Sequence, residues 1–164
     1  MTSDVRPSAT KQTLGLLMFL GVCLAIGAIG GAVTSTAVST WYQHLRKPSF
    51  NPPNWVFSPV WTALYISMAV AAWNVWRHHG LQSTRFAMSL FAGQLALNLA
   101  WSILFFGLQQ IGLALIEIIL LFAAITGTAL AFWRLDAVAA LLFIPYIAWV
   151  GFASLLNFAI WRLN

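Results

Sequence analysis

The sequence has very few charged residues. Only 7% of its 164 residues are charged, whereas a soluble domain carries about 25%. A chain this small cannot hide an apolar fraction of 61% from water, so a soluble globular protein and a disordered chain are both excluded. The net charge of +5 comes from 8 basic and 3 acidic residues without a dense basic patch, which argues against a nucleic-acid partner.

Recognisable catalytic and metal-binding patterns are also missing. The single cysteine, Cys23, excludes an intramolecular disulfide. No cluster of His, Cys and acidic residues has the spacing of a metal site. The sequence has neither a nucleophile elbow nor a phosphate-binding glycine loop. We therefore expect no metal and no obligatory cofactor, and these patterns identify no certain catalytic residue.

Long apolar runs make up most of the chain. A transmembrane helix needs about 20 apolar residues, and five segments meet this need: 14–38, 54–76, 86–106, 111–133 and 137–161. A transmembrane barrel strand would alternate apolar and polar residues, which residues 113–122 do not do. The sequence predicts an all-α membrane protein: a polar tail at 1–13 and one five-helix transmembrane domain at 14–164.

The connection at residues 39–53 differs from an ordinary linker. It contains three prolines, which exclude a continuous helix, and four bulky apolar residues, which a flexible linker would lack. Such a segment at a membrane surface can fold as a lid over one end of the bundle. It can equally be an interfacial anchor, because Trp and Tyr gather at headgroup depth. The residues leave both interpretations open.

The third apolar run carries polar side chains on one face. Gln94, Asn98 and Ser102 are spaced i, i+4 and i+8, so they form one stripe on a helix. Polar groups inside a membrane are costly, and this stripe can face a ligand cavity. The simpler alternative is that the amides only bridge neighbouring helices. On the nearly opposite face, a second stripe of small residues predicts a dimer interface: Ala92, Ala96 and Ala100.

Two further features lie within the predicted spans. Gly27-x-x-x-Gly31 allows close helix packing, although this pattern identifies no partner. Glu117 lies about two turns into the fourth span. A buried carboxyl can relay protons, which keeps open the alternative of a small proton-coupled multidrug or hydrophobic-molecule transporter. No Lys, Arg or second acid lies at comparable depth to support this alternative.

The nine tryptophans divide into two groups. Six lie near the ends of the predicted spans, as in the aromatic belts of membrane proteins: Trp41, Trp55, Trp73, Trp76, Trp133 and Trp161. Trp61, Trp101 and Trp149 lie well inside spans, where an indole N–H needs a partner. Three such indoles near a polar stripe predict a cavity for a large, flat, apolar ligand, with tight helix packing as the alternative.

Four motifs resemble one known family. They are residues 41–53 (WYQHLRKPSFNPP), 61–65 (WTALY), 97–106 (LNLAWSILFF) and 145–157 (PYIAWVGFASLLN). These motifs resemble those of the TspO/translocator protein family, whose members are also called tryptophan-rich sensory proteins or peripheral-type benzodiazepine receptors (the TspO/MBR family). The resemblance extends over all five predicted spans.

The resemblance implies a five-helix bundle, commonly a homodimer, with a pocket closed by the first loop. It implies binding of porphyrins such as protoporphyrin IX and haem, and often of cholesterol and benzodiazepine-type ligands. By position, Tyr42 matches the family's lid tyrosine, and Trp61 and Trp149 match pocket tryptophans associated with porphyrin binding and its light-dependent breakdown. The predicted ligand-binding residues are Tyr42, Trp61, Asn98, Trp101, Ser102, Trp149 and Ala153. Trp61 and Trp149 are the catalytic candidates if breakdown occurs.

One departure from the family concerns sterols. The family's cholesterol motif needs a Tyr near the end of the fifth helix, whereas residues 155–162 contain Phe158 and no Tyr. This departure counts against sterol recognition by that motif. We expect a multi-pass integral protein of a bacterial cell membrane that binds a tetrapyrrole (a porphyrin or haem). Transport, sensing and regulation of porphyrin levels all remain open, as does degradation.

Overall fold

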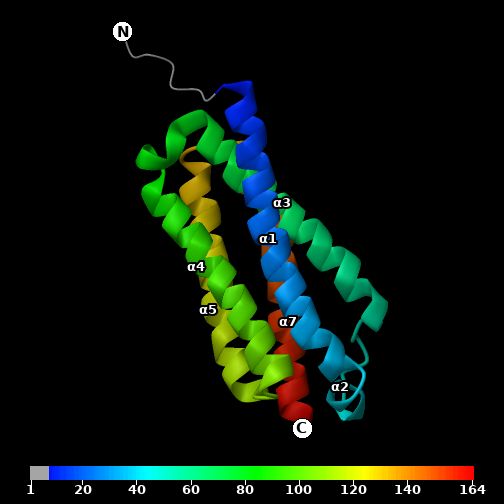
Figure 1. Cartoon of the computed structure of the whole chain (residues 1–164). Coiled ribbons are helices and arrows are strands. Elements are labelled where there is room, and N and C mark those ends of the chain that lie inside the picture. The colour runs from blue at the N-terminus through cyan, green and yellow to red at the C-terminus, as the bar shows by residue number, and fades with distance from the viewer. Residues whose placement is uncertain (1–7) are drawn as a thin grey trace.

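The computed structural model describes residues 8–164, which fold into long helices without strands (Figure 1). Five helical segments are long and apolar enough to cross a membrane, which confirms the predicted all-α membrane fold. They comprise Ala9–Val38, Asn54–Ser83, Arg85–Gly107, Ile111–Trp133 and Ala137–Leu163. Residues 1–7 of the predicted polar tail lie outside the described part of the chain.

The helical elements follow the predicted runs closely, with additional short elements. They are α1 (Ala9–Val38), α2 (Trp41–His44), α3 (Asn54–Ser83), α4 (Arg85–Ser102), α5 (Ile111–Trp133), α6 (Ala137–Leu141) and α7 (Ile144–Leu163). The end of α4 continues as a π-helical turn, η1 (Ile103–Gly107). Such turns often occur at functional sites because they rotate side chains relative to a regular helix.

Three boundaries differ from the sequence-based expectation. Helix α1 includes residues 9–13, which we had assigned to the polar tail. Helix α3 continues past the predicted end at Trp76, and Gly80, with a φ of 72°, interrupts its last turns. The fifth span is divided into α6 and α7, and Asp136 caps α6 by accepting a hydrogen bond from the Ala139 amide at 2.9 Å.

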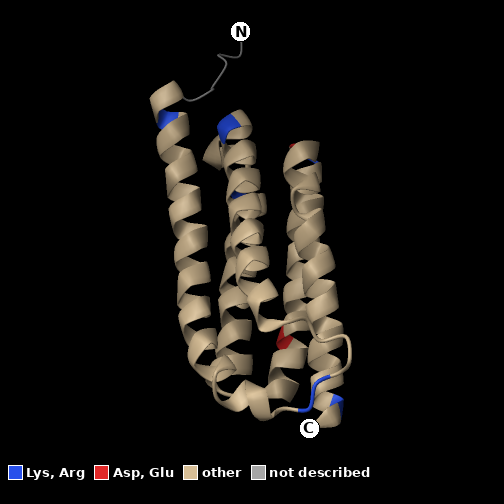
Figure 2. Cartoon of the chain, turned by 90° about the vertical axis from the view of Figure 1, so that its right-hand side faces the viewer, with Lys and Arg blue, Asp and Glu red and all other residues tan. Residues whose placement is uncertain are grey.

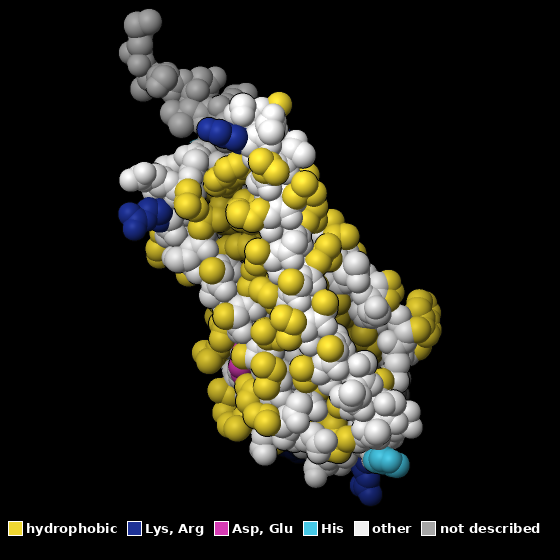
Figure 3. Space-filling model, in the orientation of Figure 1, with side chains coloured by type: hydrophobic (Ala, Val, Ile, Leu, Met, Phe, Trp, Pro, Cys, Tyr) yellow, Lys and Arg dark blue, Asp and Glu magenta, His cyan; other side chains and the backbone are white. Residues whose placement is uncertain are grey.

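The helices form an elongated bundle in which the start of α1 and the end of α7 lie at opposite ends (Figure 1). Helix α1 packs mainly on α3, α4 on α5, and α5 on α7. Figure 2 shows that Lys and Arg lie toward the two ends of the bundle. Figure 3 shows apolar side chains distributed along the length of the visible face. This distribution suits a bundle whose middle lies in hydrocarbon and whose ends lie in water.

A polar cluster connects two helices at the end of the bundle where α1 begins. Asp136 accepts hydrogen bonds from Asn74 Nδ2 at 2.7 Å and pairs with His78 Nδ1 at 3.0 Å. Burial opposes ionisation of Asp136, but the hydrogen bonds from Ala139 and His78 outweigh it and hold the pKa of this carboxyl below its usual range. The cluster ties the end of α3 to the turn before α6.

The buried apolar residues form two clusters. The larger one fills the bundle between α1, α3, α4, α5 and α7, and its aromatic centre includes Phe91, Phe132 and Phe143. The smaller one lies at the end that carries α2, and it joins Tyr42 and Phe105 to residues of α5 and α7. A cavity lies alongside both clusters.

Candidate ligand-binding site

The cavity has a volume of about 750 Å³. Its walls come from α1, α2, α3, α4, η1 and α7. Drug-sized and cofactor-sized ligands occupy pockets of about 300–1,000 Å³, so this cavity can hold one such molecule. All seven residues predicted from the sequence to bind ligand line it: Tyr42, Trp61, Asn98, Trp101, Ser102, Trp149 and Ala153. Their contact with a ligand stays a prediction.

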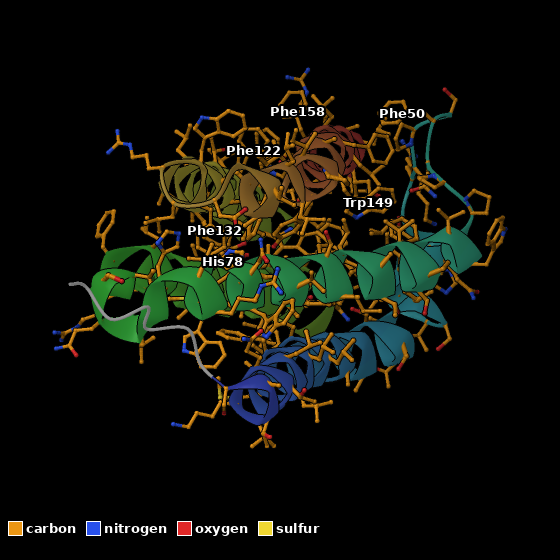
Figure 4. The ribbon with its side chains drawn as sticks, turned by 90° about the horizontal axis from the view of Figure 1, so that it is seen from above. Phe50, His78, Phe122, Phe132, Trp149 and Phe158 are labelled. Carbon is orange, nitrogen blue, oxygen red and sulfur yellow. The ribbon has the colours of Figure 1, made fainter. Side chains whose placement is uncertain are left out.

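The three interior tryptophans differ in how their indole N–H groups are satisfied. Trp101 Nε1 donates to Asn157 Oδ1 at 3.1 Å, and its ring stacks on Phe105 at 5.2 Å. Trp149 Nε1 is buried and has no hydrogen-bond partner within residues 8–164. Figure 4 shows Trp149 between α7 and α3, where it packs edge-on against Phe57. Leaving a buried donor unsatisfied is costly, and Trp149 is also one of the residues that line the cavity.

The polar stripe of α4 does not face the cavity as a unit. Gln94 is completely buried and does not line the cavity; its Oε1 accepts from the Tyr146 hydroxyl at 3.1 Å. Asn98 lines the cavity while it accepts from the Tyr65 hydroxyl and donates to Tyr146 Oη at 2.8 Å. Gln94 therefore only bridges neighbouring helices, whereas Asn98 both bridges helices and faces the cavity.

This network includes two tyrosines that the periodicity of single spans does not indicate. Tyr65 and Tyr146 come from α3 and α7, and their hydroxyls meet at Asn98. Trp61 packs against both rings, with centroid distances of 5.8 Å and 6.1 Å. Both tyrosines lie inside the family motifs at 61–65 and 145–157, so the motifs could have identified them as site residues. The periodicity of polar residues within each span could not.

The segment 39–53 covers one end of the cavity. Tyr42 is only 3% exposed, packs against Phe105 and Phe106 of η1, and donates to Asn51 Oδ1 at 2.9 Å. Lys47 Nζ lies 4.6 Å from the centre of the Tyr42 ring. Burial raises the pKa of Tyr42 to about 12, although the hydrogen bond to Asn51 opposes this rise. We call residues 39–53 the lid, because Tyr42 and Gln43 line the cavity from this end.

The tryptophans expected at the membrane surface also divide into two groups. Trp55, Trp133 and Trp161 are 48–74% exposed, as expected of belt residues. The other three pack between helices. Trp41 lies edge-on to Phe105, Trp73 donates to the Gln12 carbonyl at 2.8 Å, and Trp76 packs against Phe19. Sequence position could not distinguish these two groups.

Glu117 is 8% exposed, and neither carboxyl oxygen has a hydrogen-bond partner among the residues that the structure describes. It does not line the cavity. The stripe predicted as a dimer interface faces outward, since Ala92 and Ala96 are exposed and Ala100 is partly buried. The structure thus leaves this small-residue face free for another helix.

The fold and the cavity define a small multi-pass membrane protein with an aromatic pocket between its helices. The model of the TspO/MBR family matches residues 19–162. The chain is 46% identical to a "Tryptophan-rich protein TspO" of Chlorobaculum tepidum, over 94% of this chain and 98% of that one. It is 41% identical to the "Translocator protein" of Homo sapiens, over 76% and 75%. It is 38% identical to a "Tryptophan-rich sensory protein" of Cereibacter sphaeroides, over 90% of each. This protein therefore belongs to the TspO/MBR family.

Proposed function

We propose that this protein binds a flat tetrapyrrole, protoporphyrin IX or haem, in the cavity and acts in the transport, sensing or regulation of porphyrin levels. The observation that carries the proposal is a cavity lined by aromatic rings, one of which, Trp149, has a buried N–H with no partner among the described residues 8–164. A porphyrin offers a large aromatic face for these rings and acceptor atoms for the indole. The names of the relatives, translocator and sensory protein, support transport or sensing.

The experiment is a titration of the purified protein with protoporphyrin IX, followed by quenching of tryptophan fluorescence. Trp149→Phe keeps an aromatic ring and removes the N–H donor, so we expect affinity to fall about two- to tenfold, the value of one hydrogen bond. Trp133→Phe is the matched control, because Trp133 is 57% exposed and lies outside the cavity. Unchanged affinity in the double variant Trp61→Phe, Trp149→Phe would remove the cavity as the porphyrin site.

The same cavity supports proposals for other partners. We propose that benzodiazepine-type ligands occupy it and displace protoporphyrin IX in the same titration. Cholesterol binding is expected to be weak, because the fifth-helix motif lacks its tyrosine. We also propose a homodimer through the exposed face of Ala92, Ala96 and Ala100.

A second candidate activity is light-dependent breakdown of the bound porphyrin. Two oxidisable indoles, Trp61 and Trp149, both line the cavity and would lie beside the pigment. Illuminated protein should then convert porphyrin faster than the Trp61→Phe, Trp149→Phe variant at equal porphyrin occupancy. Equal bleaching with and without protein would exclude this activity and leave binding unaffected.

A further inference from the structure

Helices α1 and α3 are in close contact over only part of their length. Near the start of α1, Gly15 faces the ring of Trp76, and past the middle of the helix Gly27 faces the ring of Tyr65. Beyond this point α1 packs on a different neighbour: Gly30 contacts Ser102 at the end of α4. The contact partner of α1 therefore changes from α3 to α4 along its length.

Helix α3 turns to another neighbour over the same stretch. Its first turns pack on α7 through Phe57, whose ring lies 5.9 Å from that of Trp149. Pro59 lies inside these turns and removes one helical N–H donor. Figure 1 shows α1 and α3 diverging toward the end that carries α2. Both helices line the cavity over this stretch, so part of the cavity wall lies between them.

Residues on both sides of this part of the wall line the cavity and are exposed. On α1 they are Leu24, Ala28, Gly31 and Ser35, and on α3 they are Ser58 and Thr62. We call this opening the α1–α3 slot. Gly31 lines the cavity, and a Cβ atom added there would meet no atom of residues 8–164 within 4 Å, so no described side chain fills the space beside it. All six residues belong to segments long and apolar enough to cross the membrane.

The slot and the lid face different surroundings. The lid covers the end of the cavity, where Tyr42 is 3% exposed and bonded to Asn51. The slot opens sideways, between two segments that are long and apolar enough to cross the membrane. No charged residue appears among the described residues that line the cavity, so a ligand crossing the slot passes no fixed charge. A flat apolar molecule is already concentrated in lipid, because burying apolar surface is favourable.

We propose that the α1–α3 slot is a lateral portal through which the ligand passes between the bilayer and the cavity. This inference rests on the proposed porphyrin function. Gly31 keeps the portal open, because it lines the cavity from α1 and a larger side chain at this position would narrow the opening. The lid then retains the ligand at the end of the bundle, without serving as its route.

The test compares two glycines of α1 in lipid nanodiscs. Gly31→Leu narrows the slot, whereas Gly21→Leu is the matched control, because a Cβ at Gly21 also meets nothing within 4 Å and Gly21 does not line the cavity. Protoporphyrin IX is added in preloaded lipid, and quenching is followed by stopped flow. We expect Gly31→Leu to slow association and dissociation about tenfold each, a barrier increase of about 1.4 kcal/mol, while Gly21→Leu matches the unaltered protein.

A lid variant distinguishes the two routes. Asn51→Ala removes the acceptor of the Tyr42 hydroxyl and loosens the lid without touching the slot. Under lateral passage it leaves the association rate unchanged. Faster association in Asn51→Ala, or a Gly31→Leu variant that associates as fast as Gly21→Leu, would overturn the portal. If the unaltered protein shows no quenching at all, the proposed function itself fails.

Discussion

The two glycines of the Gly27-x-x-x-Gly31 motif should respond oppositely to the same substitution. In Gly27→Ala, the new Cβ would lie 2.6 Å and 2.7 Å from two ring carbons of Tyr65, whereas carbon atoms pack at about 3.5–4.0 Å. The ring cannot swing away freely, because Tyr65 is 6% exposed and its hydroxyl is bonded to Asn98. The helices must therefore move apart by about 1 Å, and overpacking of this kind costs about 1–3 kcal/mol.

The second glycine isolates this packing cost. In Gly31→Ala the added Cβ meets nothing within 4 Å. Both variants gain the same helix propensity, up to about 1 kcal/mol. This gain cancels in the difference between them, so Gly27→Ala should be less stable than Gly31→Ala by the overpacking cost, about 1–3 kcal/mol.

The assay is reversible unfolding in mixed micelles with increasing denaturing detergent, followed by circular dichroism. The difference in free energy of unfolding between the two alanine variants is the measured quantity. A difference below about 0.5 kcal/mol, the usual effect of a surface substitution, would refute the close contact between α1 and α3 at Gly27. Since Tyr65 lines the cavity, weaker porphyrin binding should accompany the destabilisation in Gly27→Ala and be absent in Gly31→Ala.

Three further predictions test the network, the lid and the dimer. Asn98→Leu removes the side chain to which the hydroxyls of Tyr65 and Tyr146 are both hydrogen-bonded. Since interhelical hydrogen bonds in membranes are worth about 0.6–1.7 kcal/mol each, this variant should lower the free energy of unfolding by about 1–3 kcal/mol. An unchanged unfolding curve in denaturing detergent would contradict this. Because the pKa of Tyr42 is raised in the closed lid, the lid is fully stable below about pH 10 and loses this stability as the pH rises through about 12. A titration followed by tyrosinate absorbance should therefore show a step near pH 12 that the Tyr42→Phe variant lacks. A Tyr42 step near pH 10 would show instead that the lid is open. Ala96→Leu should reduce chemical cross-linking of the homodimer, because a bulky side chain keeps the two α4 helices apart. Leu130→Ala, at an exposed position of α5, should leave cross-linking unchanged. Equal cross-linking in both variants would place the interface elsewhere.

Several features of the site followed from the sequence because they depend on local chemistry. Length and apolarity alone identify the five spans, since each must satisfy its own backbone hydrogen bonds in lipid. The depth of Trp61, Trp101 and Trp149 within their spans distinguished them from belt residues, and all three line the cavity. The resemblance supplied Tyr42 and Ala153, which periodicity does not distinguish.

Other features could not be read from one span at a time. Helical periodicity places Gln94 and Asn98 on one face of α4, but it does not say which neighbouring side chains each one meets one turn apart. Gln94 is buried in the core, whereas Asn98 lines the cavity. The roles of Trp41, Trp73 and Trp76 were assigned to the belt from their position in the chain. Each also packs against another element, because neighbouring helices reach those positions, and this packing could not be read from chain position.

Composition and hydropathy thus establish that this chain folds as helices in a membrane, because few charges and long apolar runs leave no other stable arrangement. The motifs establish its family. Only the packing of the helices decides that α1 leaves α3 beyond Gly27 and that Tyr65 and Tyr146 meet at Asn98. It also decides that the Trp149 N–H finds no partner within residues 8–164. The physical reason is that a cavity is the space left where helices far apart in sequence diverge, and no single helix encodes that space.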